Sequence, residues 1–311
     1  MATLGIDTSN YTTSAAVFLG GEEGLNSSRL LDTPEGALGL RQSDALFSHV
    51  KRLPEQFEAL GQAGLLRDLK AVGASTRPRA VEGSYMPCFL AGASQGQVLA
   101  HVLGVPFYGF SHQQGHIAAA AWSAGRMDLL DKPHLAWHLS GGTTELLLVE
   151  PEGCSVRAER VGGTSDISAG QLIDRTGQKL GLRFPAGKAL DELSGAAERK
   201  ICFDVKVKDF TFSLSGVENK VQAMVGAGQP PAEVAWFALD TVAQAVRRAT
   251  VAAQDRYSGL PVLCSGGVAS NTRLRYVMTE TCQAVFAQPR YSTDNAMGIA
   301  ILAARAWEAE Q

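Results

Sequence analysis

The spacing of hydrophobic and polar positions changes period along the chain, and each change predicts a switch between strand and helix. Short apolar or alternating runs predict strands at residues 4–7, 13–19, 25–31, 69–74, 105–110, 134–139, 144–149, 155–161, 262–264 and 284–287. Apolar residues three or four positions apart predict helices at residues 43–60, 87–103, 112–124, 168–180, 187–199, 232–256, 271–282 and 294–310. In the first of these helices the apolar face is predicted at Leu46, Val50, Leu53, Phe57 and Leu60.

The order of these elements repeats. Each half of the chain starts with three strands and continues with alternating helices and strands, which predicts an α/β protein of two duplicated lobes. The polar segment 125–133 is the expected boundary, so residues 1–131 form the N-terminal lobe and residues 132–311 the C-terminal lobe. The last helix is expected to return to the first lobe. Two such lobes with a central cleft are typical of the actin-like ATPase (ribonuclease H-like) fold, whose ligands bind near strand ends in the cleft.

Composition narrows the functional classes. The net charge of -3 and the pI near 6.1 argue against a protein that binds nucleic acid by charge alone. The five cysteines are an odd number, widely spaced and without a C-x-x-C motif, which favours a reducing compartment over a disulfide framework. With no signal-like start and no apolar run of about 18 residues, the expected location is the cytoplasm, away from membranes. The 33 glycines are dispersed, so they indicate turns and close packing rather than a fibrous repeat.

Two histidines suggest a metal site. His112 and His116 lie four positions apart, on one face of a predicted helix start, and this spacing suits metal ligands. No glutamate follows His112, which disfavours a zinc protease of the H-E-x-x-H type. Asp294, at the start of the last predicted helix, offers a third, oxygen ligand. A lone histidine pair at this spacing is more often an ordinary surface or core feature, and the alternative for Asp294 is an acidic residue that stabilises the helix N-terminus.

Three turns suggest phosphate or nucleotide binding. The turns at residues 7–10 and 140–144 join paired strands, one in each half, and carry hydroxyl groups or glycine amides that can bind phosphate oxygens. A third turn, with Gly266 and Gly267, follows a buried strand, and Asn271 then caps a helix or contacts a ribose or base. Either hairpin turn alone is better explained as a simple turn, but two turns at matching places in the two halves favour phosphate binding.

Acidic and basic residues give weaker indications. Asp166, Asp174 and Asp191 follow the second set of strands and serve either as helix caps or as contacts for ligand hydroxyls and amines. The basic residues are scattered and predict a solvated face or a shallow phosphate track. They include Arg77, Arg79, Lys206, Lys208, Arg247, Arg248, Arg273 and Arg275.

Taken together, these segments resemble the tRNA threonylcarbamoyladenosine transferases, formerly called O-sialoglycoprotein endopeptidases or glycoproteases. The motifs occur in the family's order over essentially the whole chain. They are L-G-I-D-T-S at 4–9, H-x-x-G-H at 112–116, S-G-G at 140–142, A-G-x-x-x-D at 169–174, L-G-L-x-x-P-x-G at 180–187, F-S-x-S-G at 212–216, S-G-G-V-x-x-N at 265–271 and T-D-N at 293–295.

The resemblance implies an acyl(carbamoyl)transferase with the actin-like fold. Such an enzyme moves a threonylcarbamoyl group from an adenylate intermediate to the exocyclic amine of the anticodon-adjacent adenine in tRNA. His112, His116 and Asp294 match the family's ligands for one divalent metal ion, iron or zinc. The residues that match its positions for ATP or the adenylate are His138, Leu139, Ser140, Gly141, Gly142, Asp174, Gly187, Asp191 and Asn271. Gly266 and Gly267 are added to this predicted set because their turn lets backbone approach a flat ligand.

The sequence departs from the family pattern at several motifs. Uncharged residues stand where the family has carboxylates, and an Arg-Pro-Arg segment at 77–79 replaces Gly-Pro-Gly. The neutral replacements are Thr12, Gln114 and Gln171, and Thr143 replaces a histidine.

These departures leave alternatives open. One is a divergent actin-like paralogue with another carbamoyl or phosphoryl acceptor, including an ATP-using kinase. Another is a non-catalytic, nucleotide-binding partner subunit. A homodimer, or a heterodimer with another actin-like chain, is a further alternative. The small-residue helix segment 91–96 is one candidate face for it, but packing of this segment inside the chain is the favoured interpretation.

Overall fold

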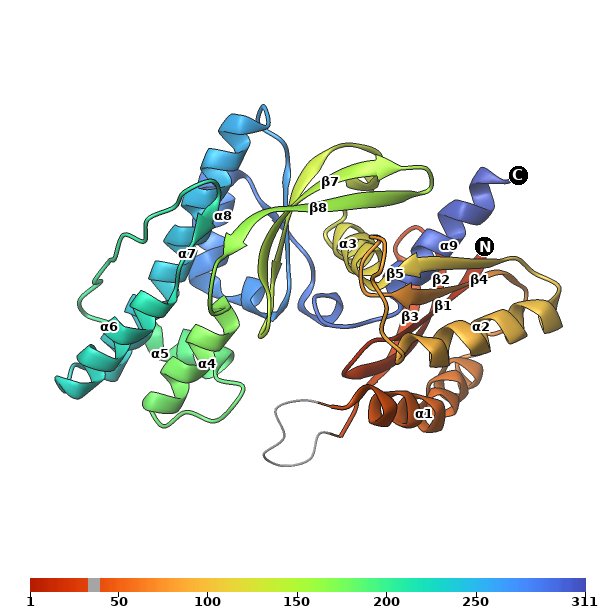
Figure 1. Cartoon of the computed structure of the whole chain (residues 1–311), viewed down its shortest axis with the longest axis horizontal. Helices are drawn as coiled ribbons and strands as arrows, with labels where there is room; N and C mark the ends of the chain where they lie inside the picture. Colours follow the sequence, from red (N-terminus) through yellow and green to blue (C-terminus); the bar gives the residue numbers. More distant parts are fainter. Residues whose placement is uncertain (33–39) are drawn as a thin grey trace. The chain divides into compact units, whose positions relative to one another are not determined.

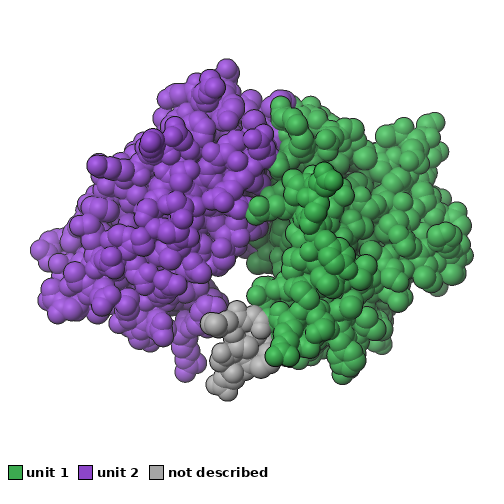
Figure 2. All heavy atoms as spheres, in the orientation of Figure 1, with its two compact units in different colours: residues 1–132, 150–158, 290–311 green, residues 133–149, 159–289 purple. Residues whose placement is uncertain are grey.

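The chain folds into two compact units. The computed structural model describes residues 1–32 and 40–311 (Figure 1). Unit 1 contains residues 1–132, 150–158 and 290–311, and unit 2 contains residues 133–149 and 159–289 (Figure 2). Each unit holds one mixed sheet with helices packed on it, which confirms the α/β class.

Unit 1 is built on a five-stranded sheet with the order β3-β2-β1-β4-β5. These strands are β1 (Ala2–Thr8), β2 (Thr12–Gly20), β3 (Glu23–Leu30), β4 (Leu69–Arg77) and β5 (Phe107–Ser111). β1, β2 and β3 form an antiparallel meander, whereas β4 is parallel to both β1 and β5. The carboxyl ends of β1, β4 and β5 therefore meet at one edge of the sheet.

Glycines let helices pack closely on both faces of this sheet. A Cβ atom on Gly92 of α2 (Phe89–Leu103) would lie 3.0 Å from Ile6. A Cβ atom on Gly5, the neighbouring position of β1, would lie 2.4 Å from the backbone of Ala300 in α9 (Met297–Ala309). Because adjacent strand residues point to opposite faces, α2 and α9 cover opposite faces. The small-residue face of α2 is therefore used inside unit 1, where Gly92 and Gly96 pack on the sheet.

Two further helices complete unit 1. α3 (His112–Ser123) packs against α9, and α1 (Gln42–Gln62) packs on β2. The buried face of α1 differs from the predicted one: Val50 is 53% exposed, and His49 takes a fully buried position instead. His49 is tolerated there because its Nδ1 atom bonds the hydroxyl of Thr13 at 2.8 Å.

Unit 2 repeats the strand order of unit 1. Its sheet has the order β11-β10-β6-β7-β8-β9, so β8-β7-β6-β10-β11 corresponds to β3-β2-β1-β4-β5. The strands are β6 (His134–Leu139), β7 (Thr144–Glu152), β8 (Ser155–Thr164), β9 (Thr211–Phe212), β10 (Val262–Ser265) and β11 (Val285–Phe286). The tips of β7 and β8, residues 150–158, group with unit 1. The predicted duplication of the fold is confirmed.

The core of unit 2 forms around a long helix, α7 (Pro231–Arg256). Trp137 of β6 is fully buried against it and donates its indole hydrogen to Thr250 at 2.8 Å. The other helices of this unit are α4 (Ala169–Lys179), α5 (Gly187–Ser194), α6 (Ser215–Gly226) and α8 (Thr272–Cys282). Single 3-10 turns are η1 (Met127–Asp131), η2 (Gly267–Ser270) and η3 (Pro289–Tyr291).

Several predicted elements need correction. α6 and β9 were not predicted, and α5 ends at Ser194 rather than at residue 199. α9 starts at Met297, so Asp294 lies in the turn before the helix and not in its first turn. The cause is Asn295, whose side chain bonds the carbonyl of Thr293 and accepts from the N–H of Met297, which closes a polar turn. No helix within the described ranges is both long and apolar enough to span a bilayer.

Candidate metal centre

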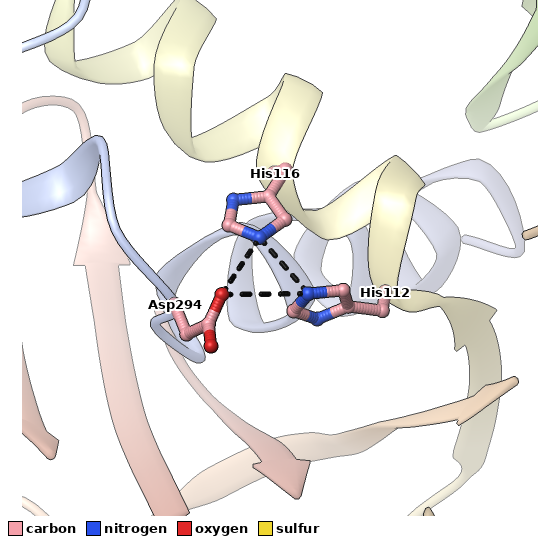
Figure 3. A group of neighbouring side chains, drawn as sticks. All are labelled: His112, His116 and Asp294. Atoms are coloured by element: carbon pink, nitrogen blue, oxygen red, sulfur yellow. Dashed lines mark hydrogen bonds and ion pairs between the residues drawn. The ribbon is translucent and has the colours of Figure 1, made fainter. Parts of the chain in front are cut away.

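The first site lies at the carboxyl edge of the unit 1 sheet. β5 ends at Ser111, and α3 begins at the next residue, His112. Ser111 caps α3 in a capping box with Gln114, which fixes the helix start. One helical turn then places His116 beside His112, and the turn before α9 brings Asp294 to both imidazoles (Figure 3).

The three donor atoms converge closely. The Nε2 atoms of His112 and His116 are 2.9 Å apart, and Asp294 Oδ1 lies 3.2 Å from His116 Nε2 and 3.6 Å from His112 Nε2. One ion with bonds of about 2.0–2.2 Å spans donors up to about 4.2 Å apart. Two imidazole nitrogens and one carboxylate oxygen also suit iron and zinc. The residues therefore fit a single divalent transition-metal ion.

Neighbouring side chains orient these ligands. Asp7, fully buried at the end of β1, lies 2.9 Å from His112 Nδ1 through its Oδ1 atom. A proton on Nδ1 that is donated to Asp7 leaves the Nε2 lone pair for a metal. The hydroxyls of Ser9 and Thr12 each donate to the second oxygen of Asp294 at 3.3 Å. Both side chains come from the hairpin of β1 and β2, so this hairpin holds the carboxylate.

The charges at this centre are strongly coupled. Burial opposes a charged His112, but the carboxylates of Asp7 and Asp294 outweigh that effect and raise the pKa of His112 to about 10. Burial likewise acts to raise the pKa of Asp294, yet hydrogen bonds from His112 and His116 hold that pKa well below its usual range. The carboxylate of Asp294 is therefore ionised at neutral pH and available to a cation.

Two glutamines that replace family carboxylates lie in structural positions. Gln114 is 7% exposed; its side-chain oxygen accepts from Ser111, and its amide donates to the Val156 carbonyl at 2.8 Å. Gln171 closes the equivalent capping box of α4 with Ser168. In a capping box, glutamine and glutamate make the same bond to the helix N-terminus. Neither replacement removes a donor from the group formed by His112, His116 and Asp294.

The glycine turns of unit 2 lie at the carboxyl ends of β6 and β10. Gly141 and Gly142 are exposed, and a Cβ atom on either would meet nothing within 4 Å. The side chain of Leu139 is fully buried, so only its backbone reaches the turn. Gly266 has φ +95°, and a Cβ atom there would lie 2.1 Å from the Leu139 carbonyl oxygen, so this position requires glycine.

The turn that follows Ser140 is fixed by hydrogen bonds. Thr143 donates its N–H to the Ser140 hydroxyl at 3.0 Å. The Ser168 hydroxyl, at the start of α4, donates to the Gly141 carbonyl at 2.6 Å. His138 is partly buried at the end of β6. The amides of Gly141 and Gly142 are therefore presented on a rigid turn, which suits phosphate oxygens.

The three aspartates predicted as ligand contacts in unit 2 each accept hydrogen bonds from other parts of this unit. Asp191 accepts from the Asn271 side chain at 2.8 Å and from the N–H of Thr272 at 2.9 Å, while Asn271 caps α8. Asp174 accepts from the N–H of Ala186 at 2.8 Å, directly before Gly187. Asp191 and Asn271 therefore meet. Asp166 instead caps the start of α6, by accepting from the N–H of Leu214 at 2.8 Å.

Some supporting groups could not be predicted from the sequence. The bond between His49 and Thr13 lies beside the turn of the hairpin that holds Asp294. Burial lowers the pKa of His49, so this imidazole is neutral. The hydroxyl contacts of Ser9 and Thr12 to Asp294 were also not predicted. These bonds join residues far apart in the chain, and no local pattern indicates them.

Comparison with solved structures defines the class of protein. Component A of the (R)-2-hydroxyglutaryl-CoA dehydratase of Acidaminococcus fermentans is similar with a TM-score of 0.58 and 16% identity, covering 100% of both chains. Full-length HypF in its phosphate- and nucleotide-bound form is similar with a TM-score of 0.61 and 13% identity, covering 99% of this chain and 46% of HypF. These likenesses and the duplicated sheets define an actin-like ATPase fold.

Sequence comparison defines the family. A family model described as tRNA N6-adenosine threonylcarbamoyltransferase (TsaD) matches residues 39–301. A protein of that name from Thermus thermophilus is 34% identical over 319 residues, covering 100% of this chain and 94% of its own length. The chain belongs to the tRNA N6-adenosine threonylcarbamoyltransferase family, which confirms the resemblance read from the motifs.

Proposed function

We propose that this chain transfers a threonylcarbamoyl group to the N6 atom of an adenosine in tRNA. The observation that carries this proposal is the convergence of His112, His116 and Asp294 in a chain related to threonylcarbamoyltransferases over its whole length. The donor is a threonylcarbamoyl adenylate, and the acceptor is the adenine beside the anticodon.

In this proposal, His112, His116 and Asp294 hold one divalent metal ion, either iron or zinc. When bound, that ion supplies Lewis-acid polarisation of a carbamoyl or phosphate oxygen. Asp7 fixes the tautomer and orientation of His112, and the hydroxyls of Ser9 and Thr12 orient Asp294. Such supporting contacts raise ligand basicity and restrict the geometry of the site.

Residues of unit 2 are proposed to bind the adenylate. The exposed amides of Gly141, Gly142 and Gly267 would contact its phosphate, and Asp174, Asp191 and Asn271 its ribose or base. His138, Leu139, Ser140, Gly187 and Gly266 complete this set. The rigid turn around Ser140 supports this assignment, because preorganised donors stabilise developing charge without reorganising.

The transfer balances as an acyl substitution. The N6 amine attacks the carbamoyl carbon, the bond from that carbon to the adenylate phosphate oxygen breaks, and AMP leaves with the electron pair. A proton is lost from N6. The chain's contribution is then chiefly positioning and charge stabilisation.

The three neutral replacements of family carboxylates give no reason to propose a changed reaction. Gln114 and Gln171 lie in capping boxes, and Thr12 donates to Asp294. None of the three replacements removes a metal donor. The metal-ligand set, the glycine turns and the full-length relationship all remain, and these features favour the family's acceptor.

The proposal also covers partners and location. tRNA and an adenine nucleotide are the expected ligands, and the reaction is placed in the cytoplasm. Pairing with a second copy or with another actin-like chain stays a proposal. Such pairing cannot use Gly92 and Gly96, because they pack on the sheet of unit 1.

The test is nucleoside analysis of tRNA after reaction. Metal-loaded protein is incubated with unmodified tRNA and threonylcarbamoyl adenylate, with and without a second actin-like chain from the same genome. We expect N6-threonylcarbamoyladenosine by mass spectrometry with the wild type but not with His116→Ala. His101→Ala, an exposed histidine on α2, is the matched control and should stay active. No modified adenosine from the metal-loaded wild type under either condition would contradict the proposal.

A further inference from the structure

An exposed arginine lies at the same sheet edge as the metal centre. β4 ends at Arg77, between β1, which ends beside Asp7, and β5, which ends at Ser111 directly before His112. Arg77 is aligned with Ser111 in the parallel pairing of β4 and β5. Neighbouring strands are about 4.8 Å apart, so the Arg77 backbone is a close neighbour of the metal-binding helix start.

Hydrogen bonds on both sides fix the backbone of Arg77. The Thr76 hydroxyl donates to the Phe110 carbonyl at 3.1 Å. The N–H of Gln113, in the first turn of α3, donates to the Pro78 carbonyl at 3.0 Å. Arg77 is thus the last residue of a paired strand, and the residue after it is bonded to the helix that carries His112 and His116.

The guanidinium group of Arg77 is available to a ligand. Arg77 is exposed, and within residues 1–32 and 40–311 it makes no ion pair. A guanidinium supplies a positive charge and a planar fork of N–H donors that matches phosphate oxygens.

We propose that Arg77 binds the phosphate group of the adenylate donor beside the metal centre. This inference rests on the proposed function, since it takes the donor to be an adenylate. A backbone phosphate of tRNA has the same chemistry, and the experiment separates the two sources. The contact draws the anionic donor to the edge of the sheet where the metal ligands lie, and it contributes binding rather than a bond-breaking step.

The test compares Arg77→Gln with Arg67→Gln in the full-length, metal-loaded protein. Arg67 is also exposed and lies just before β4, at the opposite end of the same strand, so it is a matched control. Calorimetry measures the binding of two probes, AMP and adenosine. We expect Arg77→Gln to weaken AMP binding about 10–100-fold, because a hydrogen bond to a charged group is lost. Adenosine binding should be unchanged. Arg67→Gln should change neither, and the metal content of both variants should equal that of the wild type.

A second measurement identifies the source of the phosphate. Fluorescence anisotropy follows tRNA binding to the same proteins at several salt concentrations. If Arg77 binds the phosphate of the adenylate donor, Arg77→Gln leaves unchanged both the affinity for tRNA and the slope of that affinity against salt concentration on logarithmic scales. A slope that falls by about 1 with AMP binding intact would assign Arg77 to the tRNA backbone and overturn the proposal.

Three other results would also overturn it. They are AMP binding that is equal in wild type and Arg77→Gln, adenosine binding that weakens as much as AMP binding, and a wild type that binds no AMP. Because these readouts need no transfer reaction, they are independent of the nucleoside assay. A wild type that binds AMP through Arg77 but modifies no tRNA would contradict the proposed function alone.

Discussion

At the scale of single residues, the centre depends on side chains that the fold brings together from distant positions. His116 and Asp294 are 178 positions apart in the sequence, yet their donor atoms are 3.2 Å apart. His112 is held from behind by Asp7, and Asp294 by two hydroxyls. Both of these ligands therefore have partners that restrict their orientation, as expected for a metal site.

Replacing one metal ligand should abolish tight metal binding. His116→Ala leaves two of three donors, and we expect metal retained after dialysis to fall from about one ion per chain to a trace. Atomic emission spectrometry measures the content. His101→Ala serves as the control, since His101 is exposed on α2 and its Nδ1 atom bonds the Gln97 carbonyl of the same helix. Full metal retention by His116→Ala would show that this histidine is not a ligand.

Replacing Asp7, which contacts His112, should lower metal affinity less than replacing a candidate ligand itself. Asp7→Asn keeps the size of the side chain but loses the charge that stabilises the Nδ1 proton of His112. We expect metal affinity to fall about 10–100-fold, the usual range for such orienting partners. Competition with a chelator measures the affinity. Glu55→Gln, an exposed carboxylate of α1 paired with Arg29, is the control and should bind metal as the wild type does. An unchanged affinity in Asp7→Asn would rule out an orienting role.

The sequence predicted that His112, His116 and Asp294 come together better than it predicted their surroundings, and their role as metal ligands stays a prediction. Two histidines one turn apart are a local pattern, so His112 and His116 could be read directly from the chain. The roles of Gln114 and Gln171 could not be predicted. In a sequence, a glutamine in place of a carboxylate gives the same pattern whether the residue contacts a ligand or caps a helix. The pairing of Asp191 with Asn271 depends on tertiary contact, and its role in ligand binding stays a prediction.

At the scale of elements, the crossing of α3 and α9 positions the candidate metal ligands. A Cβ atom on Gly298 of α9 would lie 1.8 Å from the carbonyl oxygen of Gly115, and one on Gly115 would lie 2.9 Å from Ile299. Gly115 stands directly before His116. The two glycines thus set how closely the histidine helix approaches the helix that follows Asp294.

Gly298→Ala should therefore reduce both stability and metal affinity. The added methyl group meets backbone, so the helices must separate, at a cost of about 1–3 kcal/mol. We expect a lower free energy of unfolding in denaturant for the metal-free protein, together with weaker metal binding. Gly216→Ala in α6 is the matched control, because its Cβ would meet nothing within 4 Å. It should be neutral or slightly stabilising, as alanine favours helices. Equal stability of the two variants would contradict the role assigned to this crossing.

A second element-scale prediction concerns acid stability. Partial burial acts to raise the pKa of Asp166, but hydrogen bonds from the Ser213 hydroxyl and from the N–H groups of Leu214 and Ser215 hold it below its usual value. A carboxyl with a lowered folded-state pKa stabilises the fold fully above its unfolded pKa, about 3.9, and loses that effect as pH falls below it. The stability difference between wild type and Asp166→Ala should thus be largest above about pH 5 and shrink below about pH 4.

Denaturant unfolding at several pH values measures this difference. The matched control is Asp255→Ala, an exposed carboxylate near the end of α7, which should show little difference at any pH. A gap between wild type and Asp166→Ala that stays constant from neutral pH to about pH 3 would show that Asp166 acts by something other than its charge.

Most elements were predictable because their patterns are local. Strands such as β6 and helices such as α7 show apolar periods that match their burial. α6 was missed because only Val217, Val221 and Met224 of its residues are buried, which gives a weak pattern. β9 has two residues and exists only through pairing with β8. The start of α9 was misplaced because the side chain of Asn295 closes a turn before the helix.

At the scale of the whole molecule, the duplicated strand order was predictable, but the path of the chain was less so. Two rounds of strands and helices reveal a repeat even without sequence identity between them. The division into lobes at residues 131 and 132 stays a prediction. The contacts divide the chain into units whose sequences interleave, since residues 150–158 and 290–311 group with residues 1–132. The return of the last helix to the first lobe was expected, whereas no pattern of hydrophobic positions indicated that residues 150–158 group with residues 1–132.

This interleaving predicts where a metal ion stabilises the molecule. All three candidate ligands and the neighbouring Asp7 lie in unit 1, and they come from β1, α3 and the turn before α9. A ligand at about 100 times its Kd adds about 2.7 kcal/mol to the state that binds it. Chelation should therefore speed amide hydrogen exchange in β1, α3 and residues 290–297, while α7 and β10 of unit 2 exchange as before. His116→Ala should exchange like the chelated wild type and not respond to the chelator. Equal acceleration in α7 and β10 would show instead that metal binding stabilises the chain as one cooperative unit.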